Sequence, residues 1–190
     1  MYQKYHTEAL VLGSRESGES DRTIALYTEV FGLVWARASA VRTESSKMRT
    51  SLQHYSRVRV SLVKGKRGWR AAGASAYAVA PGASEGVAAF ARIASLALRL
   101  VHGEEQNRYL FETLAHAHHS LVSAPVRSVG TVELLCVARV LYALGYVSAE
   151  AVDASLFSHA FYQDDALTTA KEHEGTLVRL VNRAITEARL

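Results

Sequence analysis

Residues 7–42 read TEALVLGSRESGESDRTIALYTEVFGLVWARASAVR, and this stretch predicts three β-strands in succession. The first strand is the apolar run 9–12, which Gly13 ends. The second strand, residues 22–29, alternates with the period of two that is typical of a half-buried strand. A turn at residues 30–32 leads into the third strand, where one face carries small or branched side chains: Val34, Ala36, Ala38 and Ala40.

The opposite face of the second and third strands carries Tyr27, Trp35 and Arg37. Aromatic rings beside a cation on one sheet face are typical of surfaces that stack the bases of single-stranded nucleic acids. We therefore predict that these three side chains bind nucleic acid. The alternative is that Trp35 packs against a second domain, and we expect Trp69 to have a packing role.

Two further strands follow a polar loop, which we expect to hold one helical turn around residues 51–54. Residues 57–62 alternate, and Lys64-Gly65-Lys66-Arg67-Gly68 predicts a tight hairpin before a last strand over 69–79. This pattern is compatible with a five-stranded Greek-key barrel of the oligonucleotide-binding (OB) type. Periodicity alone does not distinguish it from an SH3-like barrel.

The hydrophobic period becomes helical after Pro81-Gly82. Ser84 is a good N-cap for a first helix, and Gly145 is a good stop for a very apolar helix over 129–144. Thr169 and Glu172 have the spacing of a capping box. We predict helices over about 84–102, 105–122, 129–144 and 169–189, with a short helix and a polar turn at 163–165 between the last two.

The predicted architecture is α+β in two parts. Residues 1–80 form a DNA-binding OB-fold barrel, and residues 81–190 form an all-α helical domain that binds partners. The first part holds 13 Lys+Arg against 6 Asp+Glu, a net charge of +7, and the second holds 9 against 12, a net of −3. A basic domain indicates a polyanionic partner, although a solvated basic surface is the alternative.

Loop cations beside the predicted binding face are the candidates for phosphate contacts, because phosphate neutralisation needs only mobile cations with reach. The alternative role for them is solubility. They are Arg42, Lys47, Arg49, Lys64, Lys66 and Arg67.

Catalysis and metal binding are not expected. Gly18-Glu19-Ser20-Asp21-Arg22 holds two carboxylates, a hydroxyl and an arginine, but no nearby histidine completes a catalytic set. We expect Ser20 and Asp21 to bond local backbone amides and Arg22 to pair with an acid. His116 and His119 share a helix face but lack a clear third ligand. No phosphate-binding glycine loop is present, so we expect no cofactor and no use of ATP.

Cysteine content and hydropathy indicate the compartment in which the protein is found. Cys136 is the single cysteine, which excludes a disulfide or a four-cysteine zinc site within one chain. Its apolar helix predicts burial. The start, MYQKYHTEAL, has no secretory apolar segment, and no apolar run is long enough to cross a bilayer. We expect a cytoplasmic, nucleoid-associated protein with no membrane partner.

Several motifs resemble the RecO family of bacterial recombination mediators. They are TEALVL, GESDR, SLQHYS and KGKRGW in residues 7–70, and CVARVLYALGY at 136–146. The resemblance implies an OB-fold domain, then a helical domain, in a DNA-repair protein that binds single-stranded DNA and anneals complementary strands. It also implies action with RecR in loading recombinase on DNA coated by the single-stranded-DNA-binding protein SSB.

The resemblance further implies binding of the acidic, Phe-ended C-terminal tail of SSB, for which Arg139, matching an arginine of the family's helix signature, is the candidate contact. Three departures stand out: His54-Tyr55 replaces the usual Pro-Phe, residues 147–165 lack the four zinc-binding cysteines of many members, and the chain is shorter. A protein-interaction adaptor whose OB domain no longer binds DNA is the alternative function.

Overall fold

The computed structural model describes residues 3–44, 46–80, 82–123 and 128–188. The chain forms two compact units. The barrel unit contains Met1–Gly82 together with His102–Asn107, and the helical unit contains Ala83–Val101 and Arg108–Leu190. The predicted division at residue 80 does not include this return of the chain to the barrel unit.

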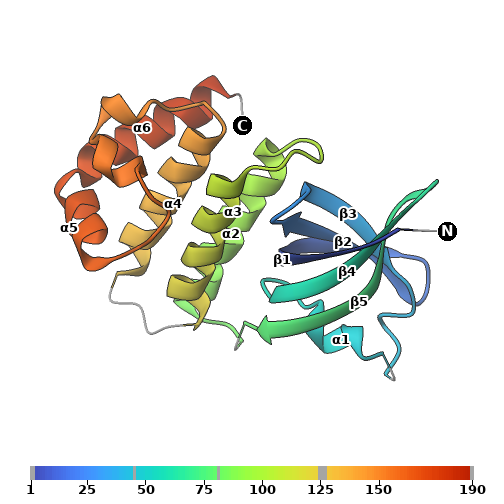
Figure 1. Ribbon diagram of the computed structural model, residues 1–190. Helices are drawn as coiled ribbons and strands as arrows, with labels where there is room; N and C mark the ends of the chain where they lie inside the picture. The colour runs from blue at the N-terminus through green and yellow to red at the C-terminus, as the bar shows by residue number, and fades with distance from the viewer. Residues whose placement is uncertain (1–2, 45, 81, 124–127, 189–190) are drawn as a thin grey trace. The chain divides into compact units, whose positions relative to one another are not determined.

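The strands of the barrel unit close into a barrel in the order β1-β2-β3-β5-β4 (Figure 1). They are β1 Lys4–Ser17, β2 Asp21–Thr28, β3 Gly32–Ala38, β4 Arg57–Gly65 and β5 Gly68–Ala78, with the short helix α1 at Met48–Ser51. β3 and β5 pair in parallel, and the other neighbouring strands pair antiparallel. The predicted OB-fold barrel is confirmed, whereas the helical turn lies at 48–51 and not at 51–54.

β1 is much longer than the run 9–12 that the sequence predicts, because it pairs with two strands. Its first half pairs with β4, from Lys4 opposite Val63, and its second half pairs with β2, ending with Ser17 opposite Asp21. A bulge between Val11 and Gly13 separates regular pairing on either side. Bulges bend a strand, and this bend allows one strand to serve both neighbours in a closed barrel.

The barrel core is filled by the alternating apolar residues that the sequence predicts, including Ile24, Leu26, Val34, Val58, Val60 and Leu62. An aromatic group packs against this core. Phe31 and Trp69 have ring centroids 4.9 Å apart, and Tyr5 lies 5.1 Å and 5.6 Å from them. Trp69 is buried, which confirms its predicted packing role.

The segment His102–Asn107 lies against the β2–β3 turn. Gln106 Nε2 donates to the Glu29 carbonyl at 3.2 Å. Gly32 has φ +63°, and a Cβ at this position would collide with the carbonyl of Glu105. Both the backbone conformation and the close approach therefore require glycine at position 32.

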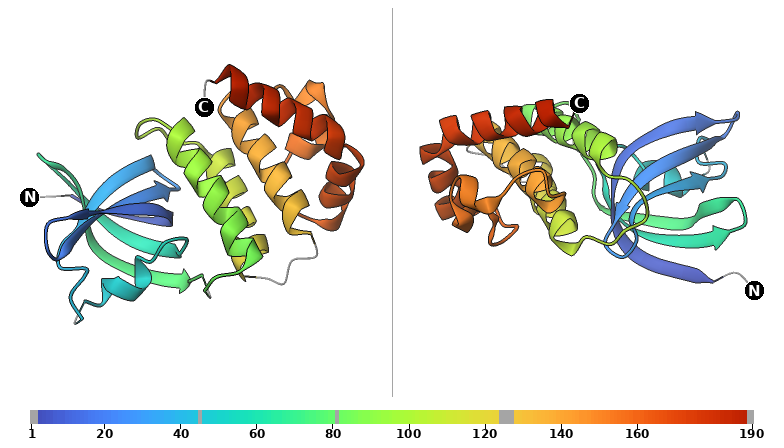
Figure 2. Two further views of the ribbon diagram at one scale, coloured as in Figure 1. Left: turned by 180° about the vertical axis from the view of Figure 1, so that it is seen from behind. Right: turned by 90° about the horizontal axis from the view of Figure 1, so that it is seen from above.

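The helical unit contains α2 Glu85–Leu100, α3 Arg108–His118, α4 Val129–Ala143, α5 Asp164–Glu172 and α6 Glu174–Glu187. A π-helical turn, His119–Ser123, extends α3, and 3-10 turns lie at Ala149–Ala151 and Ala154–Phe157. α4 is central and contacts α2, α3, α5 and α6 (Figure 2). Two of the predicted caps are confirmed: Ser84 accepts a bond from the Val87 amide, and Gly145 ends α4 with φ +80°.

The last predicted helix is wrong in one respect. The chain breaks at His173 into α5 and α6, so Thr169 and Glu172 lie inside α5 and do not cap a helix. The predicted polar turn at 163–165 instead begins α5, with Asp164 and Asp165 in its first turn. Carboxylates are favoured there because they interact with the positive end of the helix dipole.

Candidate nucleic-acid interface

Trp35 is the exposed aromatic side chain of the predicted binding face. It lies on β3 and is 41% exposed. The Cζ atom of Arg15, from the end of β1, lies 4.9 Å from the centre of its ring. This cation–π contact occupies the place where a base could stack, and cation–π contacts at exposed sites are weak enough to be exchanged for a ligand.

Tyr27 does not belong to this face, and the prediction that it presents a stacking surface is wrong. It is 1% exposed, and burial raises the pKa of its hydroxyl. The alternation rule fails here because five successive residues of β2, Ile24–Thr28, are all buried. Both faces of this half of the strand are covered, so position in the alternation does not decide exposure.

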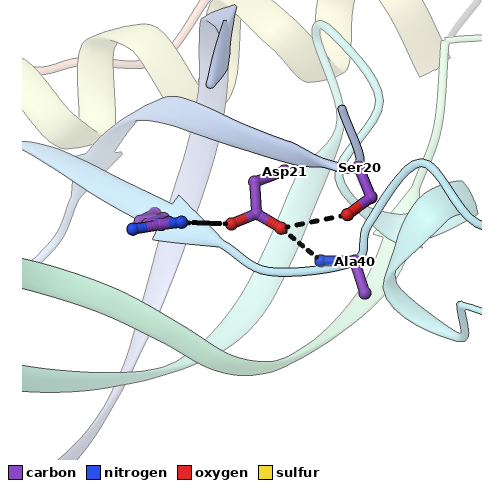
Figure 3. Close-up of polar contacts among 4 residues, drawn as sticks. Ser20, Asp21 and Ala40 are labelled. Carbon is purple, nitrogen blue, oxygen red and sulfur yellow. Dashed lines mark hydrogen bonds and ion pairs between the residues drawn. The ribbon is translucent and has the colours of Figure 1, made fainter. Parts of the chain in front are cut away.

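Asp21 links the start of β2 to the end of β3 (Figure 3). Its Oδ2 accepts from Arg37 Nε at 2.8 Å and from Nη2 at 2.7 Å, and its Oδ1 accepts from the Ala40 amide at 2.8 Å. Ser20 Oγ lies 3.5 Å from Oδ1. The Ala40 amide, and then the Arg37 guanidinium, hold the pKa of Asp21 below its usual range.

This geometry refines the interpretation of the GESDR segment. Asp21 does bond a backbone amide, but the amide belongs to Ala40, which has the left-handed φ of +52°. The ion-pair partner of Asp21 is Arg37, whereas Arg22 makes no ion pair with any described residue. The prediction for Arg22 is therefore wrong. Asp21 stabilises a strained turn and fixes a predicted DNA-binding arginine with one carboxylate.

A hollow of about 570 Å³ lies beside this ion pair, between the end of β3 and the β4–β5 hairpin. Four cations and no carboxylate line it: Arg37, Lys66, Arg67 and Arg70. Ser39, Val63 and Trp69 contribute to the remaining walls. Cations that converge on a hollow without acids attract anions, and the planar guanidinium suits phosphate oxygens.

Residues 1–70 match a family model described as Recombination protein O N terminal. This part of the chain is therefore similar to the N-terminal region of RecO proteins. Two proteins named DNA repair protein RecO, from Desulfitobacterium hafniense strains DSM 10664 / DCB-2 and Y51, are each 42% identical to it over 62 residues. The match covers 33% of this chain but spans only 23% of each relative's length.

Two of the RecO-like motifs have structural roles in the barrel. In SLQHYS, the Tyr55 amide donates to the Val11 carbonyl at 2.8 Å, and the Ser56 carbonyl accepts from the Val11 amide at 2.9 Å, beside the β1 bulge. In TEALVL, Glu8 Oε2 accepts from Tyr77 at 2.6 Å and from Arg57 at 2.9 Å, which ties β1, β4 and β5 together. Both motifs therefore brace the barrel away from the hollow.

The remaining predicted cations differ in how far they are already neutralised. Lys64 lies on β4, not in a loop, and its Nζ is 2.6 Å from Glu104 and 5.0 Å from the centre of the Trp69 ring. Arg42 pairs with Glu16 at 3.3 Å. Lys47 and Arg49 are exposed at α1 but do not line the hollow. Of the six predicted loop cations, only Lys66 and Arg67 at the hairpin tip line the hollow.

Two exposed cations near Trp35 and the hollow were not predicted: Arg15, which covers Trp35, and Arg70, which lines the hollow. Alternation along the last strand places Arg70 outside, opposite buried Trp69 and Ala71. This signal could have identified Arg70 as a surface cation. No local signal places it beside Arg37, which lies more than thirty positions earlier in the chain.

Arg139 is not on a partner-binding surface, so that prediction is wrong. It is 0% exposed on α4, and it donates to the carbonyls of Leu156 and Phe161 at 2.7 Å each. Its Cζ lies 4.8 Å from the centre of the Tyr162 ring. Buried cations require such bonds, and here they attach the irregular segment before α5 to the central helix.

His116 and His119 gain no third metal ligand from the described residues. Within the described ranges, no three His, Cys, Asp or Glu side chains form a group that could hold a metal ion. Cys136 is buried as predicted, and burial raises the pKa of its thiol to about 12. None of the described helices is both long and apolar enough to cross a membrane.

Proposed function

We propose that this chain is a DNA-repair and recombination protein that binds single-stranded DNA with its barrel unit. On this proposal it promotes annealing of complementary strands and acts with RecR to load recombinase on SSB-coated DNA. The observation that carries the proposal is the hollow lined by four cations and no acid, together with exposed Trp35 two positions before Arg37 on β3. The RecO family match supports it.

The chemistry required is binding, and we propose that the chain is not an enzyme. Two complementary strands repel one another through their phosphates, and cations that neutralise phosphates lower this repulsion while releasing condensed counterions. An exposed tryptophan stacks any base, so binding through Trp35 tolerates every sequence. Neither effect consumes ATP. The proposed setting is the cytoplasm, on the nucleoid.

The test is fluorescence anisotropy of the full chain with a labelled, unstructured oligonucleotide over a range of salt concentrations. We expect Lys66→Ala with Arg67→Ala to flatten the log–log salt slope by about 1.4, since each lost contact to a single strand removes about 0.7. Arg179→Ala with Arg183→Ala in α6 removes the same charge elsewhere and should leave the slope unchanged. A wild-type chain that does not bind DNA would refute the proposal and favour the adaptor alternative.

We further propose that the acidic tail of SSB docks on the helical unit, in a groove between α2, α4 and α6. The groove is lined by Leu96, Leu134, Val137, Val178, Val181 and Ile185, among others. Arg99 also lines it, is exposed, and makes no ion pair with a described residue. Arg92, by contrast, is held by Glu133 at 2.6 Å and 2.7 Å.

Arg99 thus replaces the buried Arg139 as the candidate contact for the carboxylates of the tail. Calorimetry with a synthetic acidic peptide ending in Phe should detect binding to the full chain. Val178→Glu should abolish binding and Arg99→Ala should weaken it at least threefold. Equal binding by wild type and both variants would exclude this groove.

A further inference from the structure

A row of outward-facing residues crosses four strands of the barrel at one level. Arg15 on β1 lies opposite Thr23 on β2, Thr23 lies opposite Arg37 on β3, and Arg37 lies opposite Arg70 on β5. We call Arg15, Arg37 and Arg70 the arginine row, and all three are exposed. Since neighbouring strands lie about 4.8 Å apart, Arg15 and Arg37 are about 10 Å apart and Arg37 and Arg70 about 5 Å.

The charge of this row is poorly balanced by the protein. Asp21 pairs with Arg37, but Arg15 and Arg70 make no ion pair with any described residue. Like charges directly opposite one another on adjacent strands destabilise a sheet, as the pair Arg37 and Arg70 does here. An anion bound between the two guanidinium groups would remove this repulsion.

Two of the three arginines are oriented by contacts before any ligand arrives. Both Nε and Nη2 of Arg37 are directed at Asp21 Oδ2, which leaves Nη1 for another acceptor. Arg15 is held over Trp35 at 4.9 Å. Trp35 precedes Arg37 by two positions on the same exposed face of β3, so its ring lies about 7 Å along the strand from the row.

We propose that the phosphodiester backbone of a single strand runs across the barrel strands along the arginine row, from Arg15 over Arg37 to Arg70. A base of this strand then stacks on the Trp35 ring in the place that Arg15 occupies without a ligand. This inference rests on the proposed function and deepens it, because it assigns a path, a direction relative to the strands, and two arginines outside the predicted set. On this path the hairpin-tip cations contact the backbone only where it leaves the row.

The experiment compares two full-length triple variants that lose the same charge. One is Arg15→Gln, Arg37→Gln and Arg70→Gln. The control is Arg59→Gln, Arg179→Gln and Arg183→Gln, which are arginines outside the row and the hollow. The probe is a labelled oligothymidylate, read by anisotropy between 0.05 and 0.5 M salt, with circular dichroism as the check that each variant is folded.

We expect the row variant to lose about 2 units of salt slope, since three contacts at about 0.7 each are removed. Extrapolated from 1 M salt, this corresponds to about 100-fold weaker binding at 0.1 M. The control should stay within threefold of wild type. Replacement of the same three arginines by Lys should retain the slope, because the charge is kept.

Equal slopes for the row variant and the control, with a wild type that binds, would overturn the path and leave the proposed function intact. A wild type that does not bind would overturn the proposed function and the path together. A row variant that loses affinity while keeping its slope would also overturn the path, because the arginines would not be contacting phosphates.

Discussion

Replacing the buried Arg139 tests whether this arginine is a structural element of the helical unit. Arg139→Met keeps an unbranched side chain that matches the arginine as far as Nε, and it removes the guanidinium with its charge and its donors. The carbonyls of Leu156 and Phe161, each bonded at 2.7 Å, then lose their partner in a part of the unit where Arg139 itself is 0% exposed. The contact with the Tyr162 ring at 4.8 Å is lost as well.

The expected cost follows from these contacts. A hydrogen bond from a charged donor contributes about 1.5–3 kcal/mol, so two bonds contribute about 3–6 kcal/mol. Removing a buried charge returns part of its desolvation penalty, which is several kcal/mol in proteins. We therefore expect a net loss of about 2–4 kcal/mol, which for a unit of this size lowers the midpoint of thermal unfolding by about 10–20 °C.

The two units can be monitored separately, because both tryptophans, Trp35 and Trp69, lie in the barrel unit. Circular dichroism at 222 nm reports mainly on the helical unit, and tryptophan fluorescence reports on the barrel unit. Arg139→Met should strongly lower the midpoint of thermal unfolding that circular dichroism reports. Arg183→Met is the matched control, since this exposed arginine pairs only with Glu187 in the next turn and should cost less than about 0.5 kcal/mol. A shift for Arg139→Met no larger than the control's would refute this account of Arg139.

Three further predictions concern the barrel unit. Gly32→Ala should lower the free energy of unfolding, measured by tryptophan fluorescence in urea, by about 2–4 kcal/mol, because it combines a left-handed backbone with a collision against Glu105. Gly18→Ala, with φ +80° but open space, should cost only about 1 kcal/mol, and equal costs would exclude the collision. The pKa of Asp21 is lowered on folding, so its stabilisation is complete well above the ordinary aspartate pKa of about 4 and is lost as the pH falls below it. The difference in unfolding midpoint between the wild type and Asp21→Asn should therefore shrink from pH 6 to pH 3. A difference that does not change with pH would contradict the ion pair. Trp35→Ala should weaken DNA binding by about 1–3 kcal/mol with an unchanged salt slope, because stacking releases no ions; a flattened slope would show that the ring only positions cations.

The sequence contains enough information for the barrel and for most of the helices, because these depend on local periodicity and on end signals such as Ser84 and Gly145. Local sequence patterns do not specify which residues of neighbouring strands lie opposite one another. Arg37 and Arg70 become neighbours only because β3 and β5 pair in parallel when the barrel closes. No alternation pattern in either strand specifies that juxtaposition.

The two wrong site predictions have different physical reasons. Tyr27 fits the exposed face by alternation, but that half of β2 is buried on both faces. Arg139 lies on a very apolar helix, where a single arginine suggests a surface position. Its acceptors are backbone carbonyls 17 and 22 positions further on, in an irregular segment whose path only the packed structure defines.

The available charge of the barrel unit is smaller than its composition suggests, and this sets the salt dependence of DNA binding. Residues 1–80 carry a net +7, but the unit also includes Glu104 and Glu105, which reduce the net charge to +5. Acids hold Arg42 and Lys64. Of the exposed cations in the hollow or the arginine row, four make no ion pair with a described residue: Arg15, Lys66, Arg67 and Arg70.

With the exposed guanidinium of Arg37, these four cations give five candidate phosphate contacts, and at about 0.7 per contact the wild-type slope should be about −3.5. A slope steeper than about −5 would mean that cations outside the hollow and the arginine row, such as Lys47 and Arg49 at α1, also contact phosphate. A slope shallower than about −2 would mean that the hollow and the arginine row are not occupied by the same strand.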